Sequence, residues 1–362
     1  MKLQTFSVQG LGLSPGIWTN DVDRSPKEVA LERLCTGTGT PLDRAWNTGL
    51  ASYVGRLWAN YAPRGQLTWI IPIYRYGRKR VHHGVQYCRD CLAEDASPYF
   101  RRRWRLAFNV VCEKHRVYLR DACGHCGAPV VFHTGDFGQR LLPLECPITR
   151  CTSCGGDLRT GPDLNRTPFS ELIAFQAKLN LALEVGWSAS LPGGQVYSFL
   201  HFEGLRYLAR LVIGTGRGER LRALLLAKRS EFDFGVVSRR RNPVFEELRH
   251  GDRVQAMELC CELLDRWPDK FVRGCQSSRV TSYFIERHNQ SAPYWLYEPI
   301  RWYLLDANYS HSHEEREAAE AYLLKRGLAV NAYSVAKLLG KVRAENAPRR
   351  MQWWNPRGPN PE

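Results

Sequence analysis

The sequence predicts a mainly α-helical, multi-domain protein with two tandem structural zinc-binding modules of the zinc-ribbon or finger type and a candidate C-terminal helix-turn-helix. Three observations support this fold class. Eight metal-ligand residues form four pairs within 67 positions, and apolar residues recur at helical spacing through much of the remaining chain. A chain of 362 residues is also long enough for two or three domains.

These patterns divide the chain into five expected regions. They are an N-terminal helical region over 1–86, tandem zinc-binding modules over 87–160, a helical domain over 161–310, a candidate helix-turn-helix over 311–348 and a flexible tail over 349–362.

Each of the four ligand pairs has two residues between its members. The pairs are Cys88 with Cys91, Cys112 with His115, Cys123 with Cys126, and Cys151 with Cys154. This spacing lets one short turn direct two ligands at a single tetrahedral zinc ion. Twenty residues separate the first two pairs and 24 separate the last two, which leaves room for one helix or hairpin in each gap. We therefore expect two Zn²⁺ ions, one held by three cysteines and a histidine and the next by four cysteines.

The expected compartment favours zinc over disulfides. The N-terminus lacks the unbroken apolar core of a signal peptide, and no stretch reaches the roughly 18 apolar residues that a membrane span requires. We expect a soluble protein of the cytoplasm that is not associated with a membrane. Its thiols would then stay reduced.

The other cysteines and nearby histidines are expected to play lesser roles. Four cysteines are most simply small buried apolar residues: Cys35, Cys260, Cys261 and Cys275. Cys146 lies five residues before Cys151 and is an open alternative to it as a ligand. Three histidines are expected at the surface or beside the ligands: His82, His83 and His125.

Both zinc ions are expected to be structural. A catalytic zinc keeps one position open for water, whereas four protein ligands close the site. The chain has no HExxH, no Walker phosphate loop and no dinucleotide fingerprint. His-x-Glu occurs without the Pro-Cys-x-x-Cys of a zinc deaminase, and the G-x-S-x-G at residues 12–16 has a proline after the serine, which removes the N–H that an oxyanion hole needs. Acidic pairs such as Glu94 with Asp95 and Glu246 with Glu247 are interpreted as solvated faces. We expect no enzymatic activity.

The charge indicates a polyanionic partner. The formal net charge is +15, and two Zn²⁺ ions with seven cysteine thiolates would leave about +12. Residues 75–120 contain twelve Arg or Lys against four Asp or Glu, and residues 325–362 contain eight against two. Such grouping favours salt-sensitive nucleic-acid binding, and a merely solvated basic surface is the alternative.

Residues 97–111 have the pattern of an amphipathic helix. Ser97 is a suitable N-cap and Pro98 a suitable first helical residue. The apolar stripe comprises Phe100, Trp104, Ala107, Phe108 and Val111. The opposite arc holds Arg101, Arg102 and Arg105. We expect these arginines to face solvent and to contact nucleic acid or an acidic protein.

Helix-compatible spacing also runs through the second half of the chain. It covers residues 169–186, 199–212, 219–230 and 253–266, and turns containing Pro or Gly separate the segments.

A candidate helix-turn-helix follows near the C-terminus. Ser312 and Glu315 form a capping box for a helix that ends near Gly327, and residues 332–339 form a second helix. The expected DNA contacts of this region are Lys337, Lys341 and Arg343. Pro348 ends a third helix early, so an ordinary helical hairpin is the open alternative. The tail from Arg349 contains Trp353, Trp354 and several prolines, and reads as a disordered end or a docking peptide.

The run CRDCLAEDASPYFRRRWRLAFNVVCEKHRVYLRDACGHCG resembles the signature of the TniQ/TnsD family, the target-selection proteins of transposons that move with a separate AAA+ ATPase and transposase. The matching positions are Cys88, Cys91, Leu92, Glu94, Asp95, Pro98, Tyr99, Trp104, Arg105, Leu106, Cys112, His115, Leu119, Cys123, Cys126 and Gly127. Leu50 to Leu57 is similar to the family's N-terminal Ser-aromatic-x-x-Arg-Leu helix. The resemblance covers roughly residues 10–160.

Several positions depart from the family pattern without removing a ligand. Arg89, Glu113 and Gly124 stand where proline is frequent, Arg116 replaces a frequent glycine, and Thr48 replaces an acidic residue.

The resemblance implies a non-catalytic adaptor for DNA transposition, in a bacterial cytoplasm and associated with the nucleoid. One surface would engage attachment-site DNA or a Cascade-like CRISPR guide-RNA effector complex, and another would recruit the AAA+ ATPase. Homodimers occur in the family, so self-association is an open expectation. A zinc-containing transcription regulator and a zinc-dependent nuclease are the alternatives in other functional classes.

Overall fold

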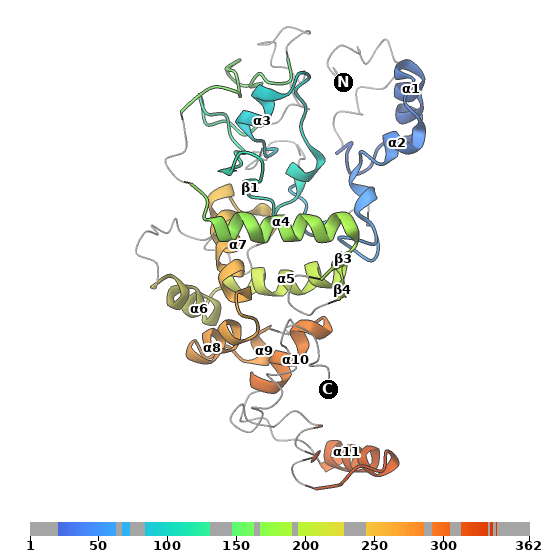
Figure 1. The fold of residues 1–362 in the computed structure, drawn as a ribbon, viewed down its shortest axis with the longest axis vertical. Helices are drawn as coiled ribbons and strands as arrows, with labels where there is room; N and C mark the ends of the chain where they lie inside the picture. The colour runs from blue at the N-terminus through green and yellow to red at the C-terminus, as the bar shows by residue number, and fades with distance from the viewer. Residues whose placement is uncertain are drawn as a thin grey trace, which may run out of the picture. The chain divides into compact units, whose positions relative to one another are not determined.

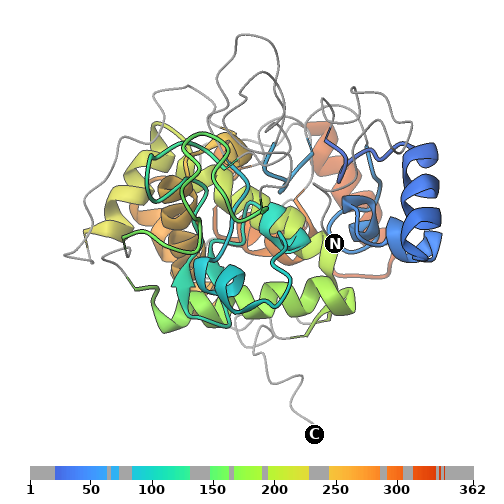
Figure 2. The same ribbon diagram turned by 90° about the horizontal axis from the view of Figure 1, so that it is seen from above.

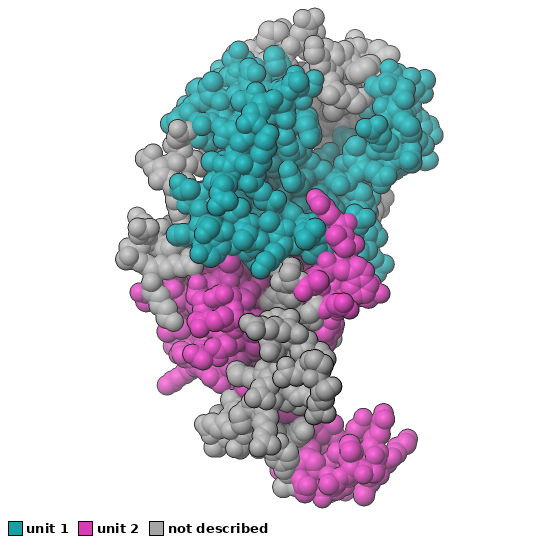
Figure 3. All heavy atoms as spheres, viewed as in Figure 1, with its two compact units in different colours: residues 1–183, 243–257 teal, residues 184–242, 258–362 magenta. Residues whose placement is uncertain are grey.

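The computed structural model describes residues 21–62, 67–72, 84–130, 147–162, 167–189, 195–227, 244–285, 292–304, 313–331, 334–335 and 338. Helices dominate these residues, as the predicted fold class requires. The chain divides into two compact units (Figure 3), of which unit 1 contains residues 1–183 and 243–257 and unit 2 contains residues 184–242 and 258–362. The five regions expected from the sequence stay predictions. Of the helices described, none is long and apolar enough to cross a membrane.

Unit 1 has short elements joined by long irregular segments (Figure 1). Its helices are α1 Glu28–Thr38, α2 Leu42–Trp46, the 3-10 turn η2 Leu50–Tyr53, α3 Arg89–Glu94, the 3-10 turn η3 Arg102–Arg105, and α4 Ser170–Val185, whose last two residues belong to unit 2. Strand β1 Val111–Cys112 pairs antiparallel with β2 Val117–Tyr118. The returning segment adds η5 Phe245–Glu247 and the first half of α7 His250–Leu264. Helices α1 and α2 lie at the edge of the unit, apart from α3 (Figures 1 and 2).

The segment that resembles the family's N-terminal helix is a single 3-10 turn. It ends at Tyr53, and Gly55 then adopts a left-handed conformation with φ of +75°. The side chains of Leu50, Tyr53 and Leu57 are nevertheless buried, whereas Val54 is exposed. The motif therefore anchors this part of unit 1 through its apolar residues without forming an α-helix.

The helix predicted over residues 97–111 is wrong. Residues 98–101 form no regular element, η3 makes one 3-10 turn, and Val111 begins β1. The burial pattern gives the reason, because every residue from Trp104 to Cys112 is buried. An α-helix with one apolar stripe would expose Leu106 and Val110, which are fully shielded from solvent here.

Arg105 does not face solvent, contrary to the sequence prediction. Its side chain is 2% exposed, and its guanidinium donates to both carboxylate oxygens of Asp21 at 3.0 and 2.5 Å. It also donates to Asp23 at 2.7 Å and to the carbonyl of Ile71 at 3.1 Å. Because these partners come from two other segments, Arg105 ties residues 21–23 and 67–72 to η3. The buried charge is tolerated only because it is paired in this way.

Buried amide side chains form hydrogen bonds with the irregular backbone in the interior of unit 1. Gln176 on α4 accepts hydrogen bonds from the backbone N–H groups of Val110 and Val111 at 2.7 and 3.0 Å, and donates to the carbonyl of Val111 at 2.6 Å. Gln86 donates to the carbonyls of Trp104, Leu106 and Asn109 within 3.2 Å. Irregular backbone can be buried here because these amides satisfy its polar groups.

The returning segment supplies a second polar connection. Arg253 is fully buried and donates to the Leu248 carbonyl at 2.6 Å and to the Gln86 side chain at 3.3 Å. Its guanidinium also lies 3.6 Å from the carboxylate of Asp121. The buried Glu246 accepts a hydrogen bond from the backbone of Trp69. Glu246 is therefore a buried acceptor and not part of a solvated face, as the sequence had suggested.

Unit 2 is a helical assembly with one small hairpin. Its elements are β3 Trp187–Ser188, β4 Val196–Tyr197, α5 Ser198–Ile213, α6 Arg217–Leu226, the second half of α7, α8 Asp269–Ser277, α9 Ser282–Ile285, α10 Tyr294–Tyr303 and α11 His313–Lys325. Trp295 on α10 is fully buried, stacks on His201 of α5 at 4.8 Å and donates to the Leu200 carbonyl at 3.1 Å. A Cβ at Gly204 would lie 2.2 Å from the Trp295 ring, so α5 requires glycine there. The helices expected over 169–186, 199–212, 219–230 and 253–266 correspond to α4, α5, α6 and α7.

The predicted helix-turn-helix is described only in part. Helix α11 ends before Gly327, which has φ of +65°, and the N–H of Leu328 bonds back to the carbonyl of Leu323 at 2.9 Å. Asn331 and Ser334 then exchange backbone-to-side-chain hydrogen bonds of 2.8 and 3.0 Å, and residues 334–335 are helical. The Ser312 end of the capping box, the third helix and the tail lie outside the described residues. The motif stays a prediction.

Replacing Arg105 with methionine should destabilise unit 1. The change leaves the carboxylate of Asp21, which is 14% exposed, without its cation, and we expect a loss of about 3 kcal/mol in the free energy of unfolding. Arg103→Met is the matched control, because Arg103 is exposed and its substitution should cost less than about 0.5 kcal/mol. Denaturant titration of the metal-loaded proteins measures both values. Equal stability of the two variants would contradict the structural role of Arg105.

His250 should make the stability fall in mild acid. Part of the residue is exposed, but its Nε2 atom is buried and has no hydrogen-bond partner among the described residues, and burial lowers the pKa of the imidazole to about 4. The unfolded imidazole binds a proton near pH 6.5 and the folded one does not, so stability is lost as the pH falls from 6.5 towards 4. The free energy of unfolding relative to His250→Gln should drop by about 2 kcal/mol between pH 7 and pH 5. A pH-independent difference would rule this out.

Candidate metal centres

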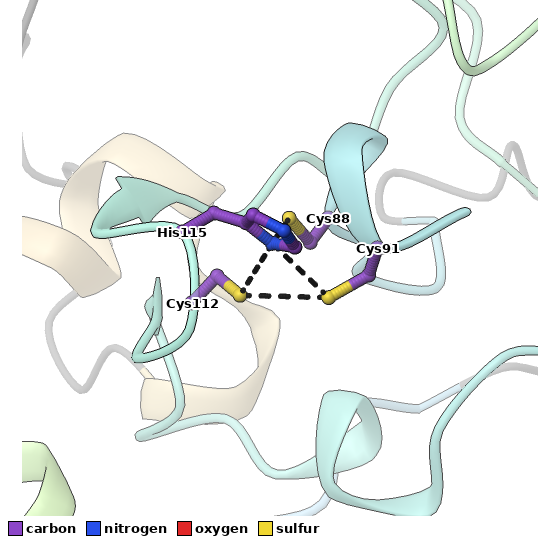
Figure 4. A group of neighbouring side chains, drawn as sticks. All are labelled: Cys88, Cys91, Cys112 and His115. Carbon is purple, nitrogen blue, oxygen red and sulfur yellow. Dashed lines mark hydrogen bonds between the residues drawn. The ribbon is translucent and has the colours of Figure 1, made fainter. Parts of the chain in front are cut away.

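The first centre joins α3 to the β1–β2 hairpin. Cys88 immediately precedes α3 and Cys91 lies in its first turn, while Cys112 ends β1 and His115 lies in the turn of the hairpin. The four side chains converge on a common point (Figure 4). All three cysteines are at most 6% exposed.

The ligand atoms of the first centre are spaced as a tetrahedral zinc site requires. With zinc–sulfur and zinc–nitrogen bonds of ordinary length, a tetrahedron separates two sulfurs by about 3.8 Å and a sulfur from a nitrogen by about 3.6 Å. The Sγ atoms of Cys91 and Cys112 are 3.6 Å apart. The Nδ1 atom of His115 lies 3.4 to 3.5 Å from the sulfurs of Cys88, Cys91 and Cys112. The donor set therefore fits Zn²⁺.

Glu94 fixes the orientation of the histidine ligand. Its carboxylate lies 2.8 Å from Nε2 of His115 and also pairs with Lys114. A bond from Nε2–H to this carboxylate leaves Nδ1 free to bind the metal, the arrangement usual for metal-bound histidines. The two hydrogen bonds, from Lys114 first and from His115 second, lower the pKa of Glu94. Glu94 thus has a specific role, whereas the sequence had suggested a solvated acidic face.

The second centre is built from two similar turns. Cys123 and Cys126 lie in one, and Cys151 and Cys154 lie in the other. The sulfurs of Cys123 and Cys154 are 3.8 Å apart, as are those of Cys126 and Cys151. These distances also match a tetrahedral zinc ion held by four cysteines.

Three of the four ligand turns share one backbone conformation. In each, the residue after the second ligand donates its N–H to the carbonyl of the first ligand, at 2.8 to 2.9 Å, and has positive φ. These residues are Arg116, Gly127 and Gly155, with φ of 55°, 71° and 74°. Glycine adopts this region without strain, so Arg116 is the residue of the three whose side chain makes this conformation costly.

The two centres belong to one cluster of buried residues. The cysteines of the first centre share it with Cys123, Cys151 and Leu158. Arg89 donates to the carbonyl of Gly161 at 3.2 Å and Arg120 donates to that of Pro162 at 2.6 Å. These bonds hold the segment after the second centre against the first, so the tandem modules form a continuous structure.

The thiol groups require a cation before they can all ionise. Without one, the Cys112 thiol has a pKa lowered to about 4, mainly because Cys88 donates a hydrogen bond to it, and the pKa of Cys88 is raised correspondingly. Burial raises the pKa of Cys91 to about 11. A bound divalent cation removes this competition by stabilising every thiolate.

The predicted ligands come together in two groups, whereas the predicted arginines serve the fold. Arg101 pairs with Asp95 at 2.9 Å and lies 4.7 and 4.8 Å from the ring centres of Tyr99 and Trp104. Arg102 donates to Asn47 and Ser52 and lies 4.5 Å from the ring centre of Tyr53. Sequence periodicity could not reveal these partners, because they depend on the folded path of the chain.

The remaining candidates have different outcomes. His125 supports the second centre through bonds of 3.0 Å to the Asp157 carbonyl and 3.1 Å to the Thr160 hydroxyl. Other candidates lie outside the described residues: His82, His83, Cys146, Lys337, Lys341 and Arg343. Cys146 as an alternative ligand therefore stays a prediction.

The fold and the two centres define a mainly helical protein organised by closed, structural-type metal sites. Residues 6–119 match the family model TniQ, so the N-terminal third of the chain contains a TniQ domain and the match supports TniQ family membership. This domain supports an association with transposition. The search of curated proteins and the search of solved structures gave no match.

We expect the purified chain to contain two zinc ions. Cys88→Ser should lose the first and Cys123→Ser the second, and each substitution should unfold its part of unit 1 because metal binding energy is folding energy. Cys35→Ser is the control, since Cys35 lies in α1 and belongs to neither centre. Elemental analysis measures the zinc content and circular dichroism the folding. Normal folding after complete metal removal would contradict the prediction.

Glu94→Ala should weaken the first centre selectively. Loss of the carboxylate that holds His115 is expected to lower zinc affinity there by roughly 10- to 100-fold. Competition with a chelator of known affinity measures this loss, and the second centre provides an internal control. An unchanged affinity at the first centre would remove the proposed role of Glu94.

Proposed function

We propose that this protein is a non-catalytic adaptor that selects target sites for DNA transposition. It would link attachment-site DNA or a CRISPR guide-RNA effector complex to the transposon's AAA+ ATPase. The match of residues 6–119 to TniQ is the observation that carries this proposal.

The geometry of the metal centres supports a non-catalytic role. Each centre offers four protein donors at tetrahedral spacing, which fills the coordination of a structural zinc ion. Glu94, the carboxylate beside the first centre, is engaged by His115 and Lys114. The centres thereby fit scaffolding, in which zinc holds short loops in a fixed arrangement.

A revised basic surface accounts for the proposed nucleic-acid contact. Arg101, Arg102 and Arg105 have partners within unit 1, so we assign phosphate contacts instead to Arg103 and Arg116. Both are exposed, and Arg116 directly follows a ligand of the first centre. The net charge of +15 favours a polyanion as partner.

Binding of zinc-loaded protein to random and candidate target duplexes across a salt series tests the proposal. The AAA+ ATPase and a guide-RNA effector complex are assayed in parallel. Capture of the ATPase, together with either one tightly bound duplex or the guide-RNA complex, is the expected result. Binding to a promoter sequence without any ATPase interaction would instead identify a transcription regulator, and metal-dependent cleavage of DNA would identify a nuclease.

Charge-removing variants sharpen the test. Arg103→Gln and Arg116→Gly should each lower the salt dependence of DNA binding by about one phosphate contact, and glycine suits the left-handed backbone at position 116. Arg220→Gln on α6 removes the same charge from an exposed site in unit 2 and is the matched control. An equal effect of all three variants would count against a specific surface in unit 1.

A further inference from the structure

The two centres differ in how far their cysteine residues are shielded. In the first centre Cys88, Cys91 and Cys112 are 1%, 2% and 6% exposed. In the second, Cys126 and Cys154 are exposed, although Cys123 and Cys151 are buried. A dissolved reagent can therefore reach one cysteine on each turn of the second centre.

The donor sets also differ in charge. Zinc with three thiolates and an imidazole carries a net charge of −1, whereas zinc with four thiolates carries −2. The greater negative charge leaves the sulfurs of the second centre richer in electrons. Exposure and thiolate character both promote attack on peroxides.

We propose that the second centre is a peroxide-sensitive thiol site that releases its zinc on oxidation, while the first centre retains its metal. The inference uses the zinc assignment of both centres and adds a reactivity that distinguishes them.

The chemistry requires one peroxide molecule for each disulfide. The sulfur of the exposed residue Cys126 attacks a peroxide oxygen, the O–O bond breaks, and the sulfur becomes a sulfenic acid while the other oxygen leaves as water after protonation. The sulfur of Cys151, 3.8 Å away, then attacks this sulfur, and the hydroxyl group leaves as a second water. Two thiolates have lost two electrons, and hydrogen peroxide has taken up those electrons and two protons. Cys154 and Cys123 form an equivalent pair at 3.8 Å.

Oxidation would remove two of the four donors and so release the ion. Gly156 packs closely against this turn, since a Cβ at Gly156 would lie 2.7 Å from the His125 ring and 3.2 Å from the Cys154 sulfur. Residues 147–162 contain the second turn and the segment held by Arg89 and Arg120. This segment would lose its metal anchor while α3 and the β1–β2 hairpin keep theirs.

Treatment of the zinc-loaded full-length chain with hydrogen peroxide tests the proposal. A colorimetric chelator follows zinc release, and alkylation with peptide mass spectrometry identifies the oxidised cysteines. We expect one of the two zinc ions to be released first, with loss of free thiols at the second centre and retention at the first. A reductant with added zinc should restore the original content. Release of both ions at one rate, or of the first-centre ion first, would overturn the proposal.

Two variants test which of the two centres reacts with peroxide. Cys126→Ser removes the second centre, so the single remaining zinc should resist the peroxide dose that releases one ion from the natural chain. Cys154→His gives the second centre the donor types of the first, and its zinc should be released several-fold more slowly once its content is verified. Rapid release from Cys126→Ser would contradict the proposal.

The readouts are independent of target selection. Lack of zinc in the purified chain would overturn this proposal and the metal assignment together. Selective zinc release from a protein that binds no ATPase would instead count against the proposed function alone.

Discussion

Mutual repulsion of the cysteine thiolates, relieved by a shared cation, is the constraint on which unit 1 depends. Between residues 50 and 160 the described backbone forms two-residue strands and helices of at most six residues. Such elements contribute few hydrogen bonds of their own. The buried cluster that contains the ligand cysteines lies at the centre of this region, so metal coordination replaces the cooperativity that a sheet or a long helix would provide.

Buried polar side chains join further segments of unit 1, in addition to those joined by the metal centres. Gln86 and Gln176 serve the backbone groups of irregular segments that run through the interior, and Arg105 neutralises carboxylates from a distant part of the chain. Each bond joins segments that are far apart in sequence. The interior of unit 1 is thus specified by a small number of directional contacts as well as by apolar packing.

The sequence predicted the features that depend on local spacing and missed those that depend on the folded path. Ligand pairs with two intervening residues identified both metal centres, and helical periodicity located α4, α5, α6 and α7. The same periodicity was misleading at residues 97–111, where burial on every side removed the amphipathic distinction on which it relies. Asp21 lies 84 residues from its partner Arg105, and Glu94 lies 21 residues from its partner His115. No local sequence pattern predicts such pairs.

The return of residues 243–257 to unit 1 has a consequence for the order of events on the ribosome. Glu246 accepts from the backbone N–H of Trp69 and Arg253 donates to the side chain of Gln86, which lie 177 and 167 residues earlier in the chain. Metal can be captured as soon as Cys154 has emerged, but the interior around Trp69 and Gln86 stays incomplete until α7 follows. During the synthesis of α5 and α6, the nascent chain therefore has its metal centres formed and the interior of unit 1 incomplete. Chaperones can bind such a partly folded intermediate.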